Sequence, residues 1–376
     1  MIIHVVKPGD TLYQISQMYN VDYQKITFDN QIPLDEYLVV GQTLVIIYDP
    51  NIKKFREIEV NGYTFPNINT EALLEILPYL TYLCIFSYQV TPEGNLILIN
   101  DDYLIEVAKI NNVIPIMVIT NIGLSGRFDS DLAKTILTNE ELQNKLIDNV
   151  MEIVQEKGYM GLNIDFEYVY PENKELFINF INKVYERLKN NNYLLFVSLA
   201  PKIRSDQPGI LYEAHDYQAI GNLADRIVLM TYEWGYAGGP ARAVAPINLV
   251  QRVLDYAITE IPSEKILMGI PNYGYDWILP YIEGTFAKSI GNYEAIEIAR
   301  HYRQAINYDY IAQTPFFNYY DELIQLHEVW FEDARSIQAK LELPIKYNLA
   351  GISYWTINRF FPQNYLVLNS LFDIKK

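Results

Sequence analysis

Two carboxyl groups stand two residues apart in a run of alternating character, 161–168, which reads Gly-Leu-Asn-Ile-Asp-Phe-Glu-Tyr. The alternation has the period of a β-strand and places Asn163, Asp165 and Glu167 on one face. Neighbours on that face lie roughly 6 to 7 Å apart, so like charge and burial raise the pKa of at least one acid. A carboxylic acid that stays protonated near neutral pH can protonate a leaving-group oxygen. The run therefore predicts a general acid, unless its polar face is solvated or an Arg or Lys neutralises it.

The elements that must hold these acids form a repeating pattern along the chain. Short β-rich runs alternate with helical stretches, which is typical of parallel strands joined by crossover helices. Eight such units over about 320 residues predict an α/β fold of the (β/α)8 TIM-barrel type, spanning 57–376. The predicted strands are 58–65, 82–88, 114–120, 162–168, 194–200, 226–232, 266–271 and 350–355.

The helical stretches lie between these strands, and the longest interval separates the last two of them. That interval carries strand-like runs of its own at 312–320 and 326–331. We therefore expect a small α+β insertion at about 278–333 that lines one wall of the cleft. The predicted helices are 72–80, 102–110, 131–157, 173–189, 247–260 and 334–341.

The carboxyl ends of the other strands supply further candidates, because active sites of such barrels lie there. The sixth strand ends in Met-Thr-Tyr-Glu at 230–233, and the eighth in Gly-Ile-Ser-Tyr-Trp at 351–355. Taken singly, a Tyr or Trp in these places also fits barrel core. Asn272 and Tyr273 follow the seventh strand and are candidates on position alone.

The fourth-strand run resembles the D-G-x-D-x-D-x-E signature of family 18 glycoside hydrolases, the chitinase and endo-N-acetylglucosaminidase family. Met160 and Asn163 replace the first two Asp residues of the signature, while Asp165 and Glu167 keep its last Asp and its Glu. The resemblance implies that Glu167 is the acid/base and that Asp165 orients the 2-acetamido group of the substrate. Asn163 occupies the deeper position, where its amide is expected to hydrogen-bond Asp165.

Two more strand ends support this resemblance. Residues 230–233 are similar to the family's M-x-Y-D motif with Glu for Asp, which implies that the Tyr232 hydroxyl bonds the acetamido carbonyl. Residues 351–355 resemble G-x-x-x-W, which implies that Trp355 forms the floor under the reacting sugar. In the implied reaction the substrate's own acetamide oxygen attacks the anomeric carbon, and water then opens the intermediate with retention. That route requires no protein nucleophile, metal or cofactor. The predicted catalytic residues are Glu167, Asp165 and Tyr232, and the predicted substrate contacts are Asn163, Glu233, Trp355, Asn272 and Tyr273.

The first 48 residues predict a separate βααβ module, with strands at 2–6 and 43–48 and helices at 12–19 and 22–30. Asp10 or Thr11 can cap the first helix. The runs at 5–12, Val-Val-Lys-Pro-Gly-Asp-Thr-Leu, and 40–46, Val-Gly-Gln-Thr-Leu-Val-Ile, resemble a LysM module. That family binds N-acetylglucosamine-containing glycans through two loops, which correspond to 9–12 and 30–38 in this sequence; a module that only mediates contacts is the alternative. Residues 49–56 read as a linker. The predicted glycan contacts are Gly9, Asp10, Thr11, Leu12, Asn30, Ile32 and Pro33.

Composition excludes several classes of function. The 29 Lys and Arg against 46 Asp and Glu give a net charge of −17, which disfavours nucleic acid and anionic membranes. The single cysteine, Cys84, cannot form an internal disulfide, and the four histidines lack the spacing of metal ligands. The first residues lack the apolar run of a signal peptide, and no run approaches a membrane span. We therefore expect synthesis in the cytoplasm without a cleaved signal.

A LysM module fused to this barrel resembles the spore-associated N-acetylglucosaminidases that degrade cortex peptidoglycan. The resemblance implies a hydrolase of N-acetylglucosamine linkages that is tethered to its glycan and deposited in the spore coat or cortex. Two alternatives remain: a chitinase-type hydrolase, since the acetamide mechanism needs only N-acetylglucosamine at the cleaved position, and a non-catalytic glycan-binding coat protein. The presence of Glu167 favours an enzyme, and the sequence makes no prediction of oligomeric state.

Overall fold

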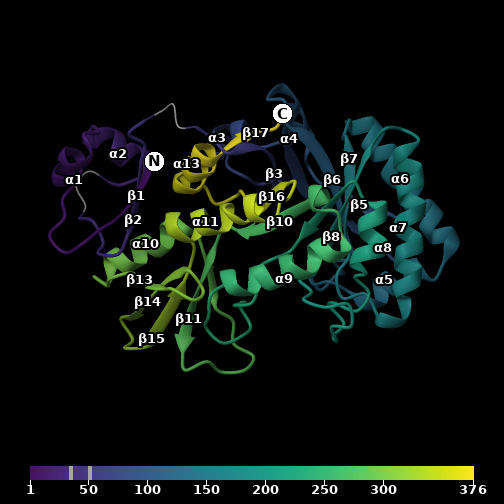
Figure 1. Ribbon diagram of the computed structural model, residues 1–376. Helices are drawn as coiled ribbons and strands as arrows, with labels where there is room; N and C mark the ends of the chain where they lie inside the picture. The colour runs from purple at the N-terminus through teal and green to yellow at the C-terminus, as the bar shows by residue number, and fades with distance from the viewer. Residues whose placement is uncertain (34–36, 50–52) are drawn as a thin grey trace.

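The computed structural model describes residues 1–33, 37–49 and 53–376. Residues 34–36 of the second predicted glycan loop and 50–52 of the predicted linker lie outside the described residues. Figure 1 shows a small N-terminal module beside a large barrel, with an antiparallel sheet attached to the barrel below the module. Within these described ranges, no helix has the length and apolar character needed to cross a membrane.

The N-terminal module has the predicted βααβ order. Strands β1 (Ile2–Val5) and β2 (Thr43–Ile46) pair antiparallel, and helices α1 (Leu12–Tyr19) and α2 (Tyr23–Asp29) lie between them in sequence. Thr11 is the N-cap of α1, because its hydroxyl accepts a hydrogen bond from the backbone N–H of Gln14. The module has a small core of its own, formed by Val6, Ile15, Ile26, Ile32, Leu44 and Ile46.

The barrel has eight parallel strands, as predicted. They pair in chain order, and the last pairs back with the first, which closes the sheet. The strands are β3 (Arg56–Thr64), β4 (Tyr82–Val90), β6 (Ile114–Thr120), β7 (Gly161–Asp165), β8 (Leu194–Leu199), β9 (Arg226–Leu229), β10 (Ile266–Pro271) and β16 (Gly351–Trp355).

Helices cover the outside of the closed sheet. They include the 3-10 turns η1 (Leu77–Tyr79), η2 (Pro171–Asn173) and η3 (Ser263–Lys265). The short strands β5 (Leu96–Ile97) and β17 (Phe372–Ile374) extend the sheet at β4 and β3. The helices are α3 (Thr70–Ile76), α4 (Asp102–Ile110), α5 (Ser130–Leu137), α6 (Glu140–Lys157), α7 (Lys174–Lys189), α8 (Tyr217–Leu223), α9 (Ile247–Glu260), α11 (Ala334–Leu341), α12 (Leu343–Lys346) and α13 (Pro362–Leu371).

The strands separate two apolar cores. Tyr63, Cys84 and Phe196 belong to the core inside the barrel, whereas Leu162 and Ile164 belong to the larger core beneath the helices. The alternation on β7 therefore points Asn163 and Asp165 inward, as the sequence pattern predicts.

Three local predictions were wrong. The single helix expected at 131–157 is two helices, because the Asn139 side chain accepts hydrogen bonds from Glu141 and Leu142 N–H and caps a new start at α6. Strands β7 and β9 end earlier than expected, so Glu167 and Tyr232 lie in loops just beyond the strand ends.

The insertion before β16 forms an antiparallel sheet in the order β12-β11-β15-β14-β13, with helix α10 (Asn292–His301) against it. The sheet starts soon after β10, before the expected position of about 278. Its strands are β11 (Gly274–Leu279), β12 (Lys288–Ile290), β13 (Asn307–Asp309), β14 (Thr314–Tyr320) and β15 (Leu326–Trp330).

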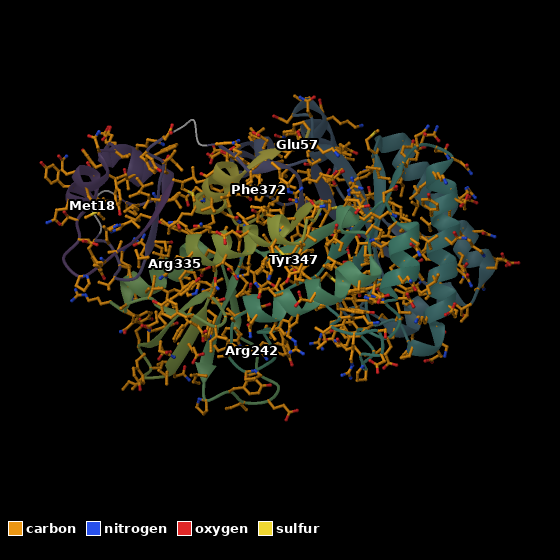
Figure 2. The ribbon with its side chains drawn as sticks, viewed as in Figure 1. Met18, Glu57, Arg242, Arg335, Tyr347 and Phe372 are labelled. Atoms are coloured by element: carbon orange, nitrogen blue, oxygen red, sulfur yellow. The ribbon has the colours of Figure 1, made fainter. Side chains whose placement is uncertain are left out.

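Buried polar contacts fix the N-terminal module on the barrel. Thr43 donates through its hydroxyl to Gln363 Oε1 (2.9 Å) and accepts through its carbonyl from Gln363 Nε2 (2.7 Å). Arg335, which Figure 2 shows between the two parts, donates to the Gly41 carbonyl (3.2 Å). A Cβ on Gly41 would stand 1.9 Å from the Ile306 carbonyl oxygen, so this close approach requires glycine.

Candidate active site

Glu167 is held by its backbone at the mouth of the barrel. Its N–H donates to Asn121 Oδ1 (2.9 Å), and its carbonyl accepts from Asn121 Nδ2 (2.8 Å). Asn121 follows β6 directly, so the neighbouring strand fixes both sides of this residue. The clamp leaves the side chain of Glu167 free to face a cavity, which it lines.

His215 holds the preceding peptide. Its Nδ1 accepts from the Ala200 N–H (2.8 Å), so the ring proton lies on Nε2, which donates to the Phe166 carbonyl (3.1 Å). Burial lowers the pKa of His215 to about 4. The imidazole is therefore neutral at physiological pH and ties the end of β8 to the segment that carries Glu167.

Asn163 lies deep in the barrel with no exposed surface. Its Nδ2 donates to the Tyr63 hydroxyl (2.8 Å) and its Oδ1 accepts from the Ser198 hydroxyl (3.1 Å). The expected hydrogen bond to Asp165 is therefore wrong: the amide is engaged by β3 and β8 instead. Asn163 lines neither of the two cavities that contain the other site residues, so any effect of Asn163 on the substrate passes through the residues above it.

The two acids share a site that disfavours charge. Burial raises the pKa of Asp165 to about 7, although the Ser198 hydroxyl acts in the opposite direction. Burial raises the pKa of Glu167 well above its usual value, and the charges of Asp165 and Glu233 raise it further. Among the described residues neither Asp165 nor Glu167 forms an ion pair. The alternative that an Arg or Lys neutralises these acids is therefore wrong. Desolvation, more than like charge, prepares a general acid here.

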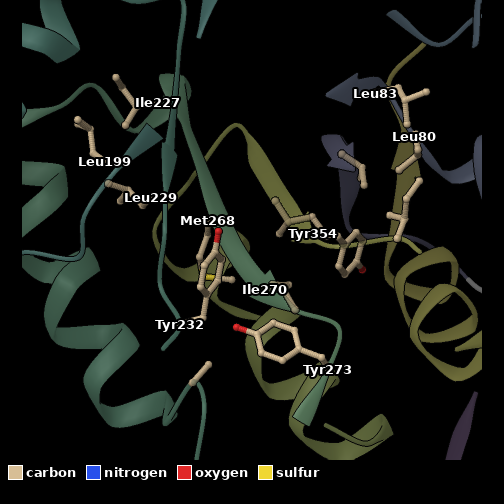
Figure 3. Packing of buried hydrophobic residues seen from close by; sticks show 14 of the residues in the cluster. Leu80, Leu83, Leu199, Ile227, Leu229, Tyr232, Met268, Ile270, Tyr273 and Tyr354 are labelled. Atoms are coloured by element: carbon tan, nitrogen blue, oxygen red, sulfur yellow. The ribbon is translucent and has the colours of Figure 1, made fainter. Parts of the chain in front are cut away.

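Tyr232 stands between these acids and the seventh strand. Its hydroxyl has a raised pKa, because it is buried and because Asp165, Glu167 and Glu233 are nearby, so it stays a hydrogen-bond donor. A Cβ on Gly269 would approach the Tyr232 ring to 2.7 Å, so glycine on β10 gives the ring its place. Figure 3 shows Tyr232 beside Met268. Tyr273 lies beyond the end of β10, with its hydroxyl turned toward Tyr232.

Glu233 follows in a left-handed conformation (φ 66°), which costs a non-glycine residue about 1 kcal/mol or more. Its carboxylate accepts from the Tyr273 hydroxyl and from the Tyr275 hydroxyl (3.0 Å). Burial raises the pKa of Glu233, while the two tyrosine hydrogen bonds lower it. The strained residue is therefore held by Tyr273, which lies between β10 and β11, and by Tyr275 of β11.

Trp355 ends β16 and keeps part of its surface in the cleft. Its ring meets Tyr63 and Phe86 edge-on, with centroids 5.3 and 4.9 Å away. Asn272 fixes the loop that follows, donating to the carbonyls of Thr356 (3.1 Å) and Arg359 (2.6 Å). Asn272 is almost fully buried, so it supports the cleft wall more than it faces the cavity.

Six of the predicted barrel residues line two adjoining cavities, whereas Asp165 and Asn163 are buried and line neither; the six are Glu167, Tyr232, Glu233, Asn272, Tyr273 and Trp355. A cavity of about 450 Å³ is lined by Trp355, Tyr273, Tyr275, Asn272 and Arg359, among others. A second, of about 120 Å³, holds Glu167, Tyr232, Tyr212 and Trp234. Glu233 lines both, so the cleft passes from the Trp355 side across the acids to the Trp234 side.

The residues predicted to bind glycan in the N-terminal module divide into two groups. Asn30 is buried, and its amide bonds Ile26 and Val45 backbone atoms at 2.7 to 2.9 Å; Ile32 belongs to the module core. Asp10 accepts from Lys7 N–H (2.7 Å) and pairs with His4. These three shape the loops, whereas the residues with open surface are Gly9, Thr11, Leu12 and Pro33.

Sequence reasoning missed Asn121, His215, Ser198, Tyr63 and the aromatic pair Tyr212 and Trp234. The strand-end rule could have found Asn121, which follows the third barrel strand. His215 belongs to no motif and precedes a helix that was not predicted, so its role needed the fold. No group of three or more His, Cys, Asp or Glu side chains placed to hold a metal occurs in the described ranges.

A closed parallel barrel with a Glu of raised pKa in a cleft at its mouth fits a glycoside hydrolase. The model of the glycosyl hydrolases family 18 matches residues 68–359, and the LysM domain model matches residues 4–46. The chain belongs to the glycosyl hydrolases family 18 and carries an N-terminal LysM module.

Similar proteins extend over the whole chain. It is 38% identical over 429 residues to a cortical fragment-lytic enzyme of Bacillus subtilis (strain 168), covering 100% of this chain and 99% of the relative. It is 42% identical over 428 residues to a cortical fragment-lytic enzyme of Bacillus anthracis, with the same coverage of both chains.

Solved structures agree with these relatives. The Bacillus cereus spore cortex-lytic enzyme SleL superposes with a TM-score of 0.94 at 36% identity, covering 100% of this chain and 99% of that one. A chitinase from Chromobacterium violaceum superposes with a TM-score of 0.78 at 24% identity, covering 83% of this chain and 98% of that one. The chitinase likeness concerns the fold alone.

Proposed function

We propose that this glycoside hydrolase cleaves N-acetylglucosamine linkages in spore cortex peptidoglycan, as an N-acetylglucosaminidase that retains configuration. The observation that carries the proposal is the Glu167 carboxyl. It faces a cavity at the barrel mouth, and burial with two neighbouring acids raises its pKa, which favours the protonated form. Full-length similarity to the cortical fragment-lytic enzymes supports the choice of substrate.

In the proposed reaction Glu167 gives its proton to the glycosidic oxygen as the bond to the anomeric carbon breaks. The acetamide oxygen of the same sugar forms a bond to that carbon, and the leaving sugar departs with the proton. Glu167, now a carboxylate, takes a proton from water, whose oxygen opens the cyclic intermediate. Two displacements at one carbon return the original configuration.

Asp165 and Tyr232 act on the acetamide in this scheme. The Asp165 Oδ1 atom is buried and lacks a hydrogen-bond partner among the described residues, so it is available to the acetamide N–H. The Tyr232 hydroxyl supplies a donor for the acetamide oxygen. Trp355 carries the ring of the same sugar on its cleft side.

The LysM module is proposed to hold the enzyme on its glycan. A cavity of about 710 Å³ lies between the module and the barrel, lined by Phe28 and Ile32 on one side and by Tyr79 and Phe360 on the other. Phe360 follows Arg359, which lines the catalytic cleft. Tethering so close to the cleft raises the local substrate concentration without high module affinity.

The same site bears on the two alternative functions, a non-catalytic coat protein and a chitinase. A non-catalytic coat protein would not need an acid of raised pKa in an open cleft, so the position and the raised pKa of Glu167 favour an enzyme. A chitinase would use the same mechanism, but the relatives that share the full length act, by their names, on cortical fragments. We further propose that the protein is made in the cytoplasm and deposited in the spore.

The test is mass spectrometry of the reducing ends released from purified cortex peptidoglycan and from chitin oligomers by the wild type and by Glu167→Gln. New N-acetylglucosamine reducing ends from cortex, absent with the variant, are expected. Release from chitin alone would move the substrate to chitin. Binding of both glycans without any release would replace the enzyme by the lectin-like alternative.

A further inference from the structure

A third cavity of the barrel mouth, separate from the one between the module and the barrel, continues the catalytic cleft on the side away from Trp355. It has a volume of about 220 Å³ and shares Pro201, Tyr212 and Trp234 with the cavity that holds Glu167. The loop after β8 and helix α9 supply its outer wall. The residues found only in this part are Ile203, Arg204, Gln207, Leu249 and Arg252.

The charge of this third cavity differs from that of the other two. Arg204 and Arg252 both line it, and no carboxylate does. The two preceding cavities instead contain Glu167 and Glu233. In a chain of net charge −17, two arginines that line a cavity beside the active site, with no carboxylate residue in the lining, favour the binding of an anion there.

Neither arginine is held in a buried ion pair in the described part of the chain. Arg204 pairs with Asp206 (3.0 Å), but both side chains are more than half exposed, so the pair is weak. Arg252 forms no ion pair within the described ranges of the chain and is exposed on α9. Guanidinium groups bind carboxylates through two parallel hydrogen bonds, which suits them to an acidic substituent.

The reaction geometry indicates which sugar reaches this cavity. A general acid lies at the glycosidic oxygen, between the reacting sugar and the leaving sugar. With the reacting N-acetylglucosamine on Trp355, the leaving sugar occupies the cavity of Glu167, Tyr212 and Trp234. In peptidoglycan that leaving sugar is N-acetylmuramic acid, whose lactyl ether ends in a carboxyl group or in a peptide with free carboxylates.

We propose that Arg204 and Arg252 form an anion subsite for the carboxylates of the muramyl substituent on the leaving-group side of the cleft. The inference rests on the proposed function, since it assumes cleavage between N-acetylglucosamine and N-acetylmuramic acid. The subsite would favour acidic fragments over neutral N-acetylglucosamine oligomers. The catalytic residues do not supply this selectivity.

The experiment compares one muramyl-peptide tetrasaccharide with the same compound after its carboxylates are coupled to methylamine. The wild type is expected to cleave the acidic form with a kcat/KM about tenfold higher. The double variant Arg204→Gln, Arg252→Gln is expected to lose that preference and to cleave both forms at similar rates. Raising the salt concentration should lower the wild-type preference too.

Arg187→Gln is the matched control, because Arg187 is an exposed arginine on α7 that pairs with Asp148; it should keep the wild-type preference. Equal rates of the wild type on the two compounds, or a preference that survives in the double variant, would overturn the subsite. The wild-type comparison holds even if the double variant fails to fold. If the wild type cleaves neither compound while binding cortex, the proposed function itself fails.

Discussion

The mouth of the barrel and the LysM module both contact glycan in the proposed function, but they are built in opposite ways. At the mouth, Asn121, Glu167 and His215 come from separate stretches of the chain, and buried or partly buried hydrogen bonds join these stretches. In the module, the first loop is held by contacts between residues close in sequence, such as the hydrogen bond from the Lys7 N–H to Asp10. In the proposed function the acid is buried by segments that are distant in sequence. Retention on the glycan depends instead on a short exposed loop.

The comparison predicts that the largest loss follows from removing the acid itself. Glu167→Gln should lower kcat/KM by about a thousandfold or more, since a positioned general acid contributes on the order of 10² to 10⁴ in rate. Binding of the variant to cortex should stay near wild type, because the module is untouched. Initial rates on soluble cortex fragments and a pull-down on insoluble cortex measure the two effects. A loss below tenfold would remove Glu167 from the role of acid.

The next largest effect concerns the support of the acid. His215→Ala leaves the Phe166 carbonyl and the Ala200 N–H unpaired in a buried place, which costs about 1 to 3 kcal/mol for each group. We expect a lower melting temperature and a kcat reduced about tenfold with little change in KM. His215→Gln offers both a donor and an acceptor and should recover much of each.

Thermal melting and steady-state kinetics of the two His215 variants test this positioning role. An Ala variant that melts early but keeps the wild-type kcat would make His215 purely structural. The same result would mean that the Asn121 clamp alone positions Glu167.

These two residues also show what sequence reasoning can reach. The acids on β7 and the candidates at the strand ends could be predicted because alternation and strand position are local properties. Asn121 contacts a residue 46 positions away and His215 one 49 positions away, so both depend on how neighbouring strands are staggered. The early ends of β7 and β9 were missed because the pattern of side chains continues past the last ladder hydrogen bonds.

The pH dependence of stability gives a third test of the burial at the mouth. Asp165 has a folded-state pKa of about 7, above its usual value, so the folded state binds more protons than the unfolded state between about pH 4 and 7. Its contribution therefore disfavours folding progressively as pH rises through that window. Asp165→Asn should melt several degrees higher than wild type at pH 8 and differ less at pH 5, while losing activity.

Differential scanning calorimetry at the two pH values checks the Asp165 prediction. A variant whose stability difference from wild type is the same at pH 5 and pH 8 would show that Asp165 is not held in a desolvated site. Activity of the wild type is expected to fall as the pH rises through the raised pKa of Glu167, because Glu167 then loses the proton that it must donate.

The smallest effect is expected in the module. Pro33→Ala changes a partly exposed residue of the second predicted glycan loop and should weaken retention on insoluble cortex by about threefold. The rate on short soluble fragments should not change. Met18→Ala, on the exposed side of α1 outside both loops, serves as the control. Equal retention of the two variants would indicate that this loop makes no glycan contact.

In the proposed function the barrel site cleaves with the help of the substrate's acetamide, with Glu167 as the acid. Proton NMR during hydrolysis of a cortex tetrasaccharide follows the anomeric signal of the new N-acetylglucosamine reducing end before it equilibrates. The β-anomer is expected to appear first and then to convert to the α-anomer. First appearance of the α-anomer would mean a single displacement by water and would contradict the proposed roles of Asp165, Tyr232 and Glu167.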